Sequence, residues 1–102
     1  MDRIAMLKEI LAANPVDAFA RYGLAMEHFG AGDIPAALRE FEALLKAHPD
    51  YTAGYFMAAQ TLAKASRVDE ARKLLADGIA SAQRTGNQHA LSEMQGMLDE
   101  LG

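Results

Sequence analysis

Hydrophobic side chains recur every three or four residues in six stretches of the chain, and short polar turns separate these stretches. In the first stretch Ile4, Leu7 and Leu11 fall on one stripe, which Asn14-Pro15 ends because proline disfavours helix in the residue before it. No stretch has the alternation of a strand. The pattern predicts an all-α chain of six helices: about 2–13, 18–30, Pro35 to His48-Pro49, 52–65, 69–83 and 88–101.

The turns contain residues that start and stop helices. Asp17 is expected to cap the second helix, and Pro35 suits the first turn of the third, where its missing N–H costs nothing. Asp50 or Thr52 is expected to cap the fourth helix. The connections between the helices are therefore expected to be short. Short connections predict that neighbouring helices pack as antiparallel hairpins.

The chain repeats itself, and the interval from Pro15 to Pro49 is the period of the repeat. A shift by this period places Leu7 on Phe41 and Ala25 on Ala59. Large positions therefore recur as large and small positions as small. A period of this length is typical of a stack of helical hairpins, in which no single hairpin can bury its apolar face alone.

Composition and charge narrow the classes of function. The chain has 102 residues, enough for one domain, and it has no cysteine, which excludes disulfides, thiolate nucleophiles and the usual zinc frameworks. The net charge of −4 comes from acids and bases that are interspersed, with no basic cluster, so no nucleic-acid partner is expected. No apolar run approaches the roughly 20 residues that span a bilayer, so no membrane partner is expected, and the location predicted is cytoplasmic.

The repeat resembles the tetratricopeptide repeat (TPR) family, whose pattern is W-x₂-L-G-x₂-Y, then A-x₃-F, then P. The matching residues in 18–51 are Leu24, Ala25, Ala37, Phe41 and Pro49, and those in 52–85 are Tyr55, Ala59, Ala71 and Leu75. The resemblance implies a six-helix α-α superhelix. Its expected plan is a half repeat at 1–17, whole repeats at 18–51 and 52–85, and a C-terminal capping helix in 86–102.

Four residues depart from the family pattern. Arg21 and His28 replace its Trp and Tyr in the first whole repeat, and Ala58 and Gln83 replace its Leu and Pro in the second. The small residues have a physical reason, since they lie where the two helices of a hairpin approach most closely. The departures leave the packing between the two repeats open.

The candidate binding surface is an apolar stripe on the first helices of the two repeats. The resemblance implies that these helices line the concave side of the array, where members of the family commonly bind peptides. Aromatic and methionine side chains suit such a role, because they dominate interface energies and adapt to irregular partners. The predicted peptide-binding residues are Phe19, Tyr22, Met26, Phe29, Phe56, Met57, Gln60 and Lys64.

The alternative interpretation is that part of this stripe is core. In so short a stack the neighbouring helices cover some of it, and Phe19, Tyr22 and Phe56 are the residues for which burial is an equal alternative. The carboxylate clamp of some TPR domains needs Lys, Asn and Arg on this surface. Tyr22 and Met26 stand where that clamp has Lys and Asn, so it is not expected here.

No constellation of residues favours catalysis. His89 and Glu93 lie four residues apart, but no second histidine is near them in sequence, so an exposed ion pair is expected there and not a metal site. No cofactor motif and no activated serine are evident, and the chain is predicted not to be an enzyme. Two functions remain: an adaptor that binds an apolar or amphipathic peptide segment of another protein in its concave groove, and a structural homodimer that uses the same apolar surface.

Overall fold

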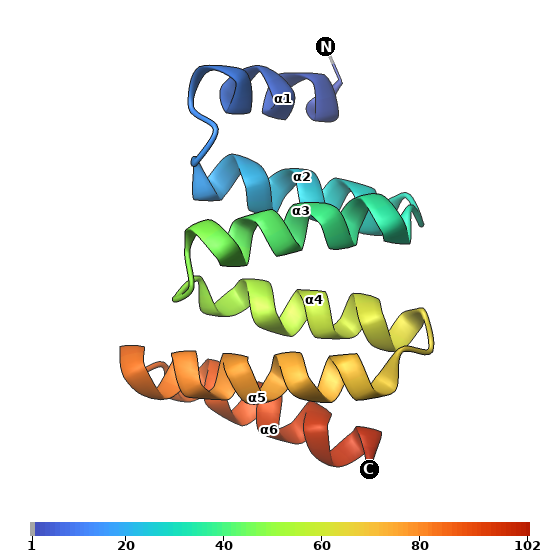
Figure 1. Cartoon of the computed structure of the whole chain (residues 1–102), viewed down its shortest axis with the longest axis vertical. Helices are drawn as coiled ribbons and strands as arrows, with labels where there is room; N and C mark the ends of the chain where they lie inside the picture. Colours follow the sequence, from blue (N-terminus) through green and yellow to red (C-terminus); the bar gives the residue numbers. More distant parts are fainter. Residues whose placement is uncertain (1) are drawn as a thin grey trace.

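The computed structural model describes residues 2–102 and contains six α-helices in this part of the chain. Figure 1 shows them stacked in sequence order along the longest axis of the molecule. The molecule measures 41 × 29 × 19 Å along its principal axes. The all-α prediction is confirmed, and no strand occurs within residues 2–102. The helices are α1 (Arg3–Ala13), α2 (Ala18–Gly30), α3 (Ile34–Ala47), α4 (Thr52–Lys64), α5 (Val68–Thr85) and α6 (Gln88–Leu101).

The closest packing is within two hairpins, α2 with α3 and α4 with α5. The alanines that the repeat pattern places at their contacts are fully buried, and the apolar side chains that fill the remaining space are at most 1% exposed. These four positions are closed to solvent, so a larger side chain there would have to displace its neighbours. The alanines are Ala25, Ala37, Ala59 and Ala71, and the fillers are Phe41 and Leu75.

The first and last helices pack on opposite ends of this pair of hairpins. Leu7 of α1 is fully buried and lies against the backbone of Gly23 in α2. At the other end, Met94 of α6 is fully buried in the cluster that contains Tyr55 and Leu75. Buried apolar side chains thus form three clusters along the stack, from α1 with α2 at one end to α4, α5 and α6 at the other.

Helix starts follow the sequence with one exception. The Asp17 and Asp33 carboxylates accept hydrogen bonds from backbone N–H groups of the first turns of α2 and α3. The expectation that Asp50 or Thr52 caps α4 is wrong, because the cap residue is Tyr51 and no side chain accepts there. The Asp50 carboxylate is instead occupied by Ser81 and Arg84 of α5.

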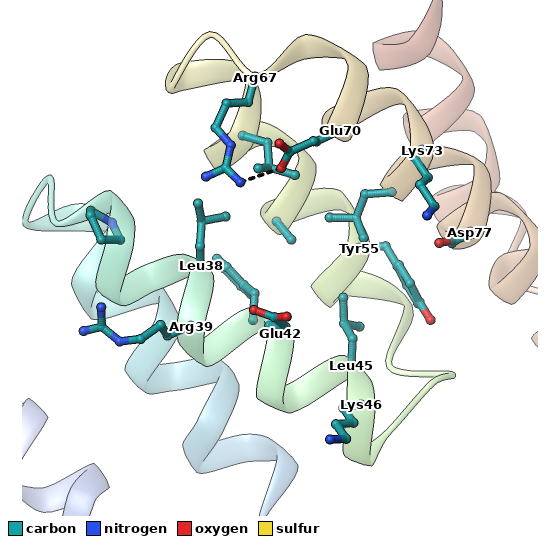
Figure 2. A pocket seen from close by; sticks show the side chains of 15 residues that line it. Leu38, Arg39, Glu42, Leu45, Lys46, Tyr55, Arg67, Glu70, Lys73 and Asp77 are labelled. Atoms are coloured by element: carbon teal, nitrogen blue, oxygen red, sulfur yellow. Dashed lines mark hydrogen bonds and ion pairs between the residues drawn. The ribbon is translucent and has the colours of Figure 1, made fainter.

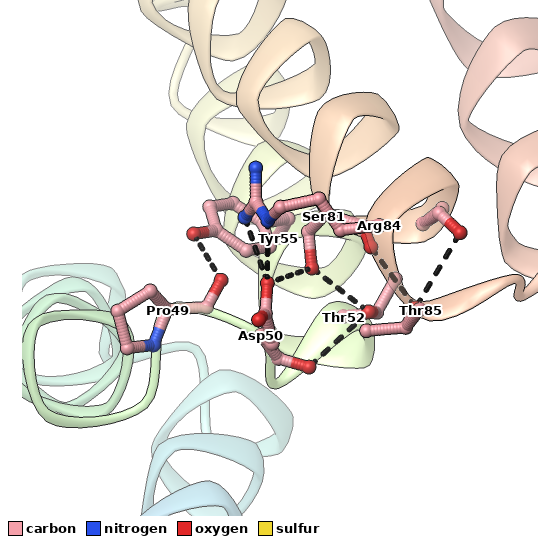
Figure 3. Close-up of polar contacts among 8 residues, drawn as sticks. Pro49, Asp50, Thr52, Tyr55, Ser81, Arg84 and Thr85 are labelled. Carbon is pink, nitrogen blue, oxygen red and sulfur yellow. Dashed lines mark hydrogen bonds and ion pairs between the residues drawn. The ribbon is translucent and has the colours of Figure 1, made fainter.

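In each whole repeat, a side chain of the first helix holds the turn that precedes this helix. The two contacts are equivalent. Arg21 donates from Nη2 to the Pro15 carbonyl at 2.9 Å, and Tyr55, one period later, donates from its hydroxyl to the Pro49 carbonyl at 2.7 Å. Figure 3 shows the second of these turns, with Asp50 reached by Arg84 and Ser81. Arg21 thus departs from the family pattern and still performs the hydrogen bonding of its counterpart.

The turns between the two helices of each hairpin also correspond. Gly32 and Ser66 are one period apart, and both have positive φ, +79° and +62°. A left-handed residue ends the first helix and reverses the chain in both repeats. Ser66 carries a steric cost that glycine at the same place avoids.

Candidate peptide-binding surface

Four of the predicted binding residues lie together on α2 and α4. Tyr22, Met26 and Phe29 follow one another at helical spacing on α2, and Met57 of α4 packs against the same core cluster. All four are half-buried, so each presents part of its side chain to solvent. We call this set, together with Lys64, the α2–α4 surface.

Tyr22 is held in place by two aromatic neighbours. Its ring meets the edge of Phe41 with 6.3 Å between centroids, and it lies 5.3 Å from the ring of Tyr51. Burial raises the pKa of Tyr22, and the neighbouring Tyr51 raises it further. Tyr22 is therefore a fixed, neutral aromatic group at neutral pH.

Lys64 joins the ends of α2 and α4. Its Nζ lies 5.1 Å from the centroid of the Phe29 ring, a cation–π contact. The side chain of Lys64 is exposed, so its charge remains available to a bound segment. This end of the α2–α4 surface is thus both apolar and cationic.

The other three predicted residues differ from one another in exposure. Phe19 is 70% exposed at the start of α2, and Phe56 is half-buried against the cluster built from α4, α5 and α6. Gln60 is half-buried on α4. The stripe is therefore neither wholly core nor wholly exposed, and peptide binding by its eight residues stays a prediction.

The sequence did not predict a groove on other helices. A cavity of about 820 Å³ lies between α3 and α5, with α4 as its floor, and none of the eight predicted residues lines it. Figure 2 shows Leu38 and Leu45 of α3 and Tyr55 of α4 in this groove, with charged side chains along both walls. No single residue type in the sequence marks this groove, because its lining comes from three helices.

Titratable groups outside this surface were also predicted from the sequence to include an ion pair, His89 with Glu93. Residues 2–102 contain no group of three His, Cys, Asp or Glu side chains that could hold one. The His89 Nε2 lies 3.3 Å from the Glu93 Oε1, as the spacing predicted, and both side chains are open to solvent.

Comparisons with known proteins agree with this architecture. The sequence model described as tetratricopeptide repeat matches residues 28–94, which is more than half of the chain. The chain belongs to the tetratricopeptide repeat family. TPR domains generally mediate protein–protein interaction, and proteins of the family are generally non-catalytic scaffolds.

Individual relatives and solved structures cover most of the chain. A TPR repeat-containing protein of Pseudomonas aeruginosa is 28% identical over 95 residues, which cover 93% of this chain and 90% of that protein. The crystal structure of a TPR domain protein from Salinibacter ruber is 35% identical, with a TM-score of 0.79 over 83% of this chain and 94% of that one. The solution structure of a Bordetella parapertussis protein is 26% identical, with a TM-score of 0.85 over 99% of this chain and 88% of that one.

Among the helices of residues 2–102, none combines the length and the apolar character that crossing a bilayer requires.

Proposed function

We propose that this TPR protein is a non-catalytic adaptor, which binds an apolar or amphipathic peptide segment of another protein in its concave groove. The supporting observation is the α2–α4 surface, where aromatic and methionine side chains stay half-exposed although the core beneath them is complete. The cytoplasmic location expected from the sequence belongs to the same proposal. The proposed contact residues remain Phe19, Tyr22, Met26, Phe29, Phe56, Met57, Gln60 and Lys64.

The energetics favour a transient complex. Tyr22 and Phe29 supply rigid rings that lose little rotamer freedom on binding, and Met26 and Met57 adapt to the side chains of the partner. Two repeats offer only a short groove. A segment bound there would bury a total area near or below ~1,200 Å², and interfaces smaller than this tend to be weak. The proposed affinity is therefore modest.

The experiment changes Met26 to Glu and identifies by mass spectrometry what co-purifies with each variant from native extract. A carboxylate at this half-buried position would oppose an apolar partner, and the proposal expects loss of the partners of the parent chain. Ala12→Glu on the exposed side of α1 is the matched control, because it adds the same charge elsewhere. A folded Met26→Glu variant that retrieves the same partners contradicts the proposal.

A structural homodimer is the second candidate, and exposed apolar side chains near the start of α2 favour it. Val16 is 61% exposed and Phe19 is 70% exposed, while the residues one period later, Asp50 and Ala53, are polar or small and also exposed. The fold therefore does not require apolar residues at these places. Sedimentation at several concentrations tests this candidate: a strict monomer excludes the dimer, and a dimer that Phe19→Ser dissociates supports it.

A further inference from the structure

The helix α1 packs on a single neighbour. It lies against α2 through Leu7 and Leu11, and no other helix of residues 2–102 has comparable contact with it. Each of the other five helices in this part of the chain packs against at least two neighbours. One side of α1 is therefore open.

The open side of α1 is apolar. Met6, Ile10 and Ala13 follow at spacings of four and three residues, so they lie along one face, about 110° around the helix from Leu7 and Leu11. Met6 is 40% exposed, Ile10 is half-buried and Ala13 is exposed. We call Met6, Ile10 and Ala13 the α1 face.

The first whole repeat shows what covers the equivalent face of α3. One period after Met6 stands Glu40, which pairs with Arg21 of α2, with 2.9 Å between Oε2 and Nη1. One period after Ile10 stands Leu44, which is 1% exposed in the cluster between α2, α3 and α4. In α3 this face is therefore covered by α2, the first helix of its own repeat.

In the second whole repeat the same place is covered by α4. Gly78, two periods after Ile10, lies so close to Tyr55 of α4 that a Cβ built on the glycine would be 2.6 Å from the tyrosine Cβ. In both repeats the covering helix runs antiparallel to the helix that it covers (Figure 1). The α1 face thus corresponds to a surface that takes one antiparallel helix, and no helix of residues 2–102 lies on it.

The distribution of exposed apolar side chains favours a second copy of the chain as the occupant. Among residues 2–102 the exposed large ones are Met6, Val16 and Phe19, all before residue 20. At the opposite end of the stack, the exposed residues of α6 are polar, charged or glycine (Figure 1). Head-to-tail contact would set an apolar end against a polar one, whereas two-fold symmetry sets two apolar ends together.

A two-fold axis across α1 also gives the required direction. It places the α1 helices of two copies antiparallel and brings Met6 of each copy opposite Ile10 of the other. The end of the stack has a cross-section of 29 × 19 Å. Two such ends in full contact would cover roughly 1,100 Å² in total, which is in the range of weak interfaces.

We propose that the α1 face is the interface of a symmetric homodimer, in which the α1 helices of two copies pack antiparallel. Each α1 then covers the other as α2 covers α3. Burial of Met6 and Ile10 of both copies drives the association. The proposal rests on the homodimer named above as the second candidate and assigns its interface to α1; it does not depend on the adaptor function of the α2–α4 surface.

Glu9 gives this interface a characteristic dependence on salt. It is exposed beside Ile10, and it has no ion-pair partner within 4 Å among residues 2–102. Two-fold pairing brings the Glu9 side chains of both copies to the same edge of the interface, where they repel each other. Salt screens this repulsion, so the dimer should strengthen with salt, whereas an interface held by ion pairs would weaken.

Sedimentation equilibrium of the 102-residue chain, from micromolar to millimolar concentration, measures the dimer. We expect the parent to associate weakly, and more strongly at high salt. Met6→Glu places a carboxylate of each copy in the interface and should weaken association at least about tenfold. Ala12→Glu is the matched control, because it adds the same charge to the exposed side of α1 away from the α1 face, and it should change association less than about twofold.

A mixture of two variants tests whether both copies use the same face. Met6→Lys alone should also weaken association at least about tenfold, because like charges again meet. An equimolar mixture of Met6→Glu and Met6→Lys should restore association, since opposite charges then face each other across the axis. If the mixture associates no more strongly than either variant alone, the proposal is overturned.

Methionine methyl signals distinguish this interface from the other surfaces. As the parent is concentrated, the Met6 signal should shift, while those of Met26, Met57 and Met94 stay in place. Met26→Glu should leave association unchanged, so failure of the adaptor and failure of this interface are separate results.

Four results would overturn the proposal. They are a strict monomer, a dimer whose Met26 signal shifts in place of Met6, a dimer that Phe19→Ser dissociates and Met6→Glu does not, and a monomer whose Met6→Glu variant loses a co-purifying partner. The third result would leave the homodimer standing and move its interface to the start of α2. The fourth would assign the α1 face to another protein.

Discussion

Single residues at helix crossings determine how closely the stack can pack. Gly78 of α5 lies where α4 and α6 meet it, and a Cβ built there would be 2.6 Å from the Cβ of Tyr55 and 2.5 Å from the Sδ of Met94. Real side chains do not approach so closely. Glycine is therefore needed at this position because the neighbouring side chains leave no room for a Cβ, and not because of its φ.

Gly78→Ala should accordingly destabilise the protein although alanine is the better helix former. We expect a loss of about 1–3 kcal/mol in the free energy of unfolding, measured by urea denaturation. Gly96 of α6 is the matched control, because a Cβ there has nothing within 4 Å. Gly96→Ala should gain up to about 1 kcal/mol, and a similar gain for Gly78→Ala would disprove the close approach.

The tyrosines predict how stability changes at alkaline pH. Burial raises the pKa of Tyr22, Tyr51 and Tyr55 above the ordinary value of 10.0; the charges of Asp77 and Asp50 raise that of Tyr55 further, and Arg84 lowers it. The folded state thus holds these protons more strongly than the unfolded state. The resulting stability is complete below pH 10 and is lost as the pH rises through the raised values.

Tyrosinate absorbance measures this effect directly. In the folded protein the absorbance should rise at a higher pH than in the urea-unfolded chain, and the free energy of unfolding should fall over the same interval. Superimposable titration curves for the folded and unfolded protein would contradict the burial of the three rings.

At the scale of elements, the turn before α4 is attached to the end of α5 through Asp50. Its carboxylate accepts from Arg84 Nη2 at 2.7 Å and from Ser81 Oγ at 3.3 Å, and the fully buried Ser81 hydroxyl lies 3.0 Å from that of Thr52 (Figure 3). One acidic side chain thus joins a turn to the helix that closes the next hairpin.

Asp50→Ala removes this connection. We expect a loss of about 1 kcal/mol in the free energy of unfolding, since the side chain is half-exposed and solvent screens part of the interaction. Glu93→Ala is the control, because the His89–Glu93 pair lies within one exposed helix and should contribute under about 0.5 kcal/mol. Equal effects of the two substitutions would show that the Asp50 contacts do not hold the turn.

The bounds of the elements could be predicted to within two residues, because proline, glycine and capping aspartates mark them locally. The largest error is at the end of α5, expected near Gln83 and observed at Thr85. Gln83 replaces the proline that ends the two preceding repeats, so the helix continues until Gly86 takes a left-handed conformation with φ of +69°.

For the whole molecule, the sequence predicted the stack and four residues that meet on the α2–α4 surface. Periodicity alone could not predict how far Tyr22 or Phe56 would be covered, since that depends on Tyr51 for the first and on the cluster built from α4, α5 and α6 for the second. Periodicity could not predict the α3–α5 groove either, for the same reason. Its residues come from three helices, and only the folded chain brings them together.

If a partner segment covers the α2–α4 surface, as proposed above, the methionine methyl groups of that surface will report its binding. Met26 and Met57 lie on that surface, Met94 is fully buried, and Met6 is exposed on α1. In methyl NMR spectra, addition of the partner that co-purifies with the parent chain should shift the Met26 and Met57 signals and leave those of Met6 and Met94 in place. Unchanged Met26 and Met57 signals in a saturated complex would contradict the claim.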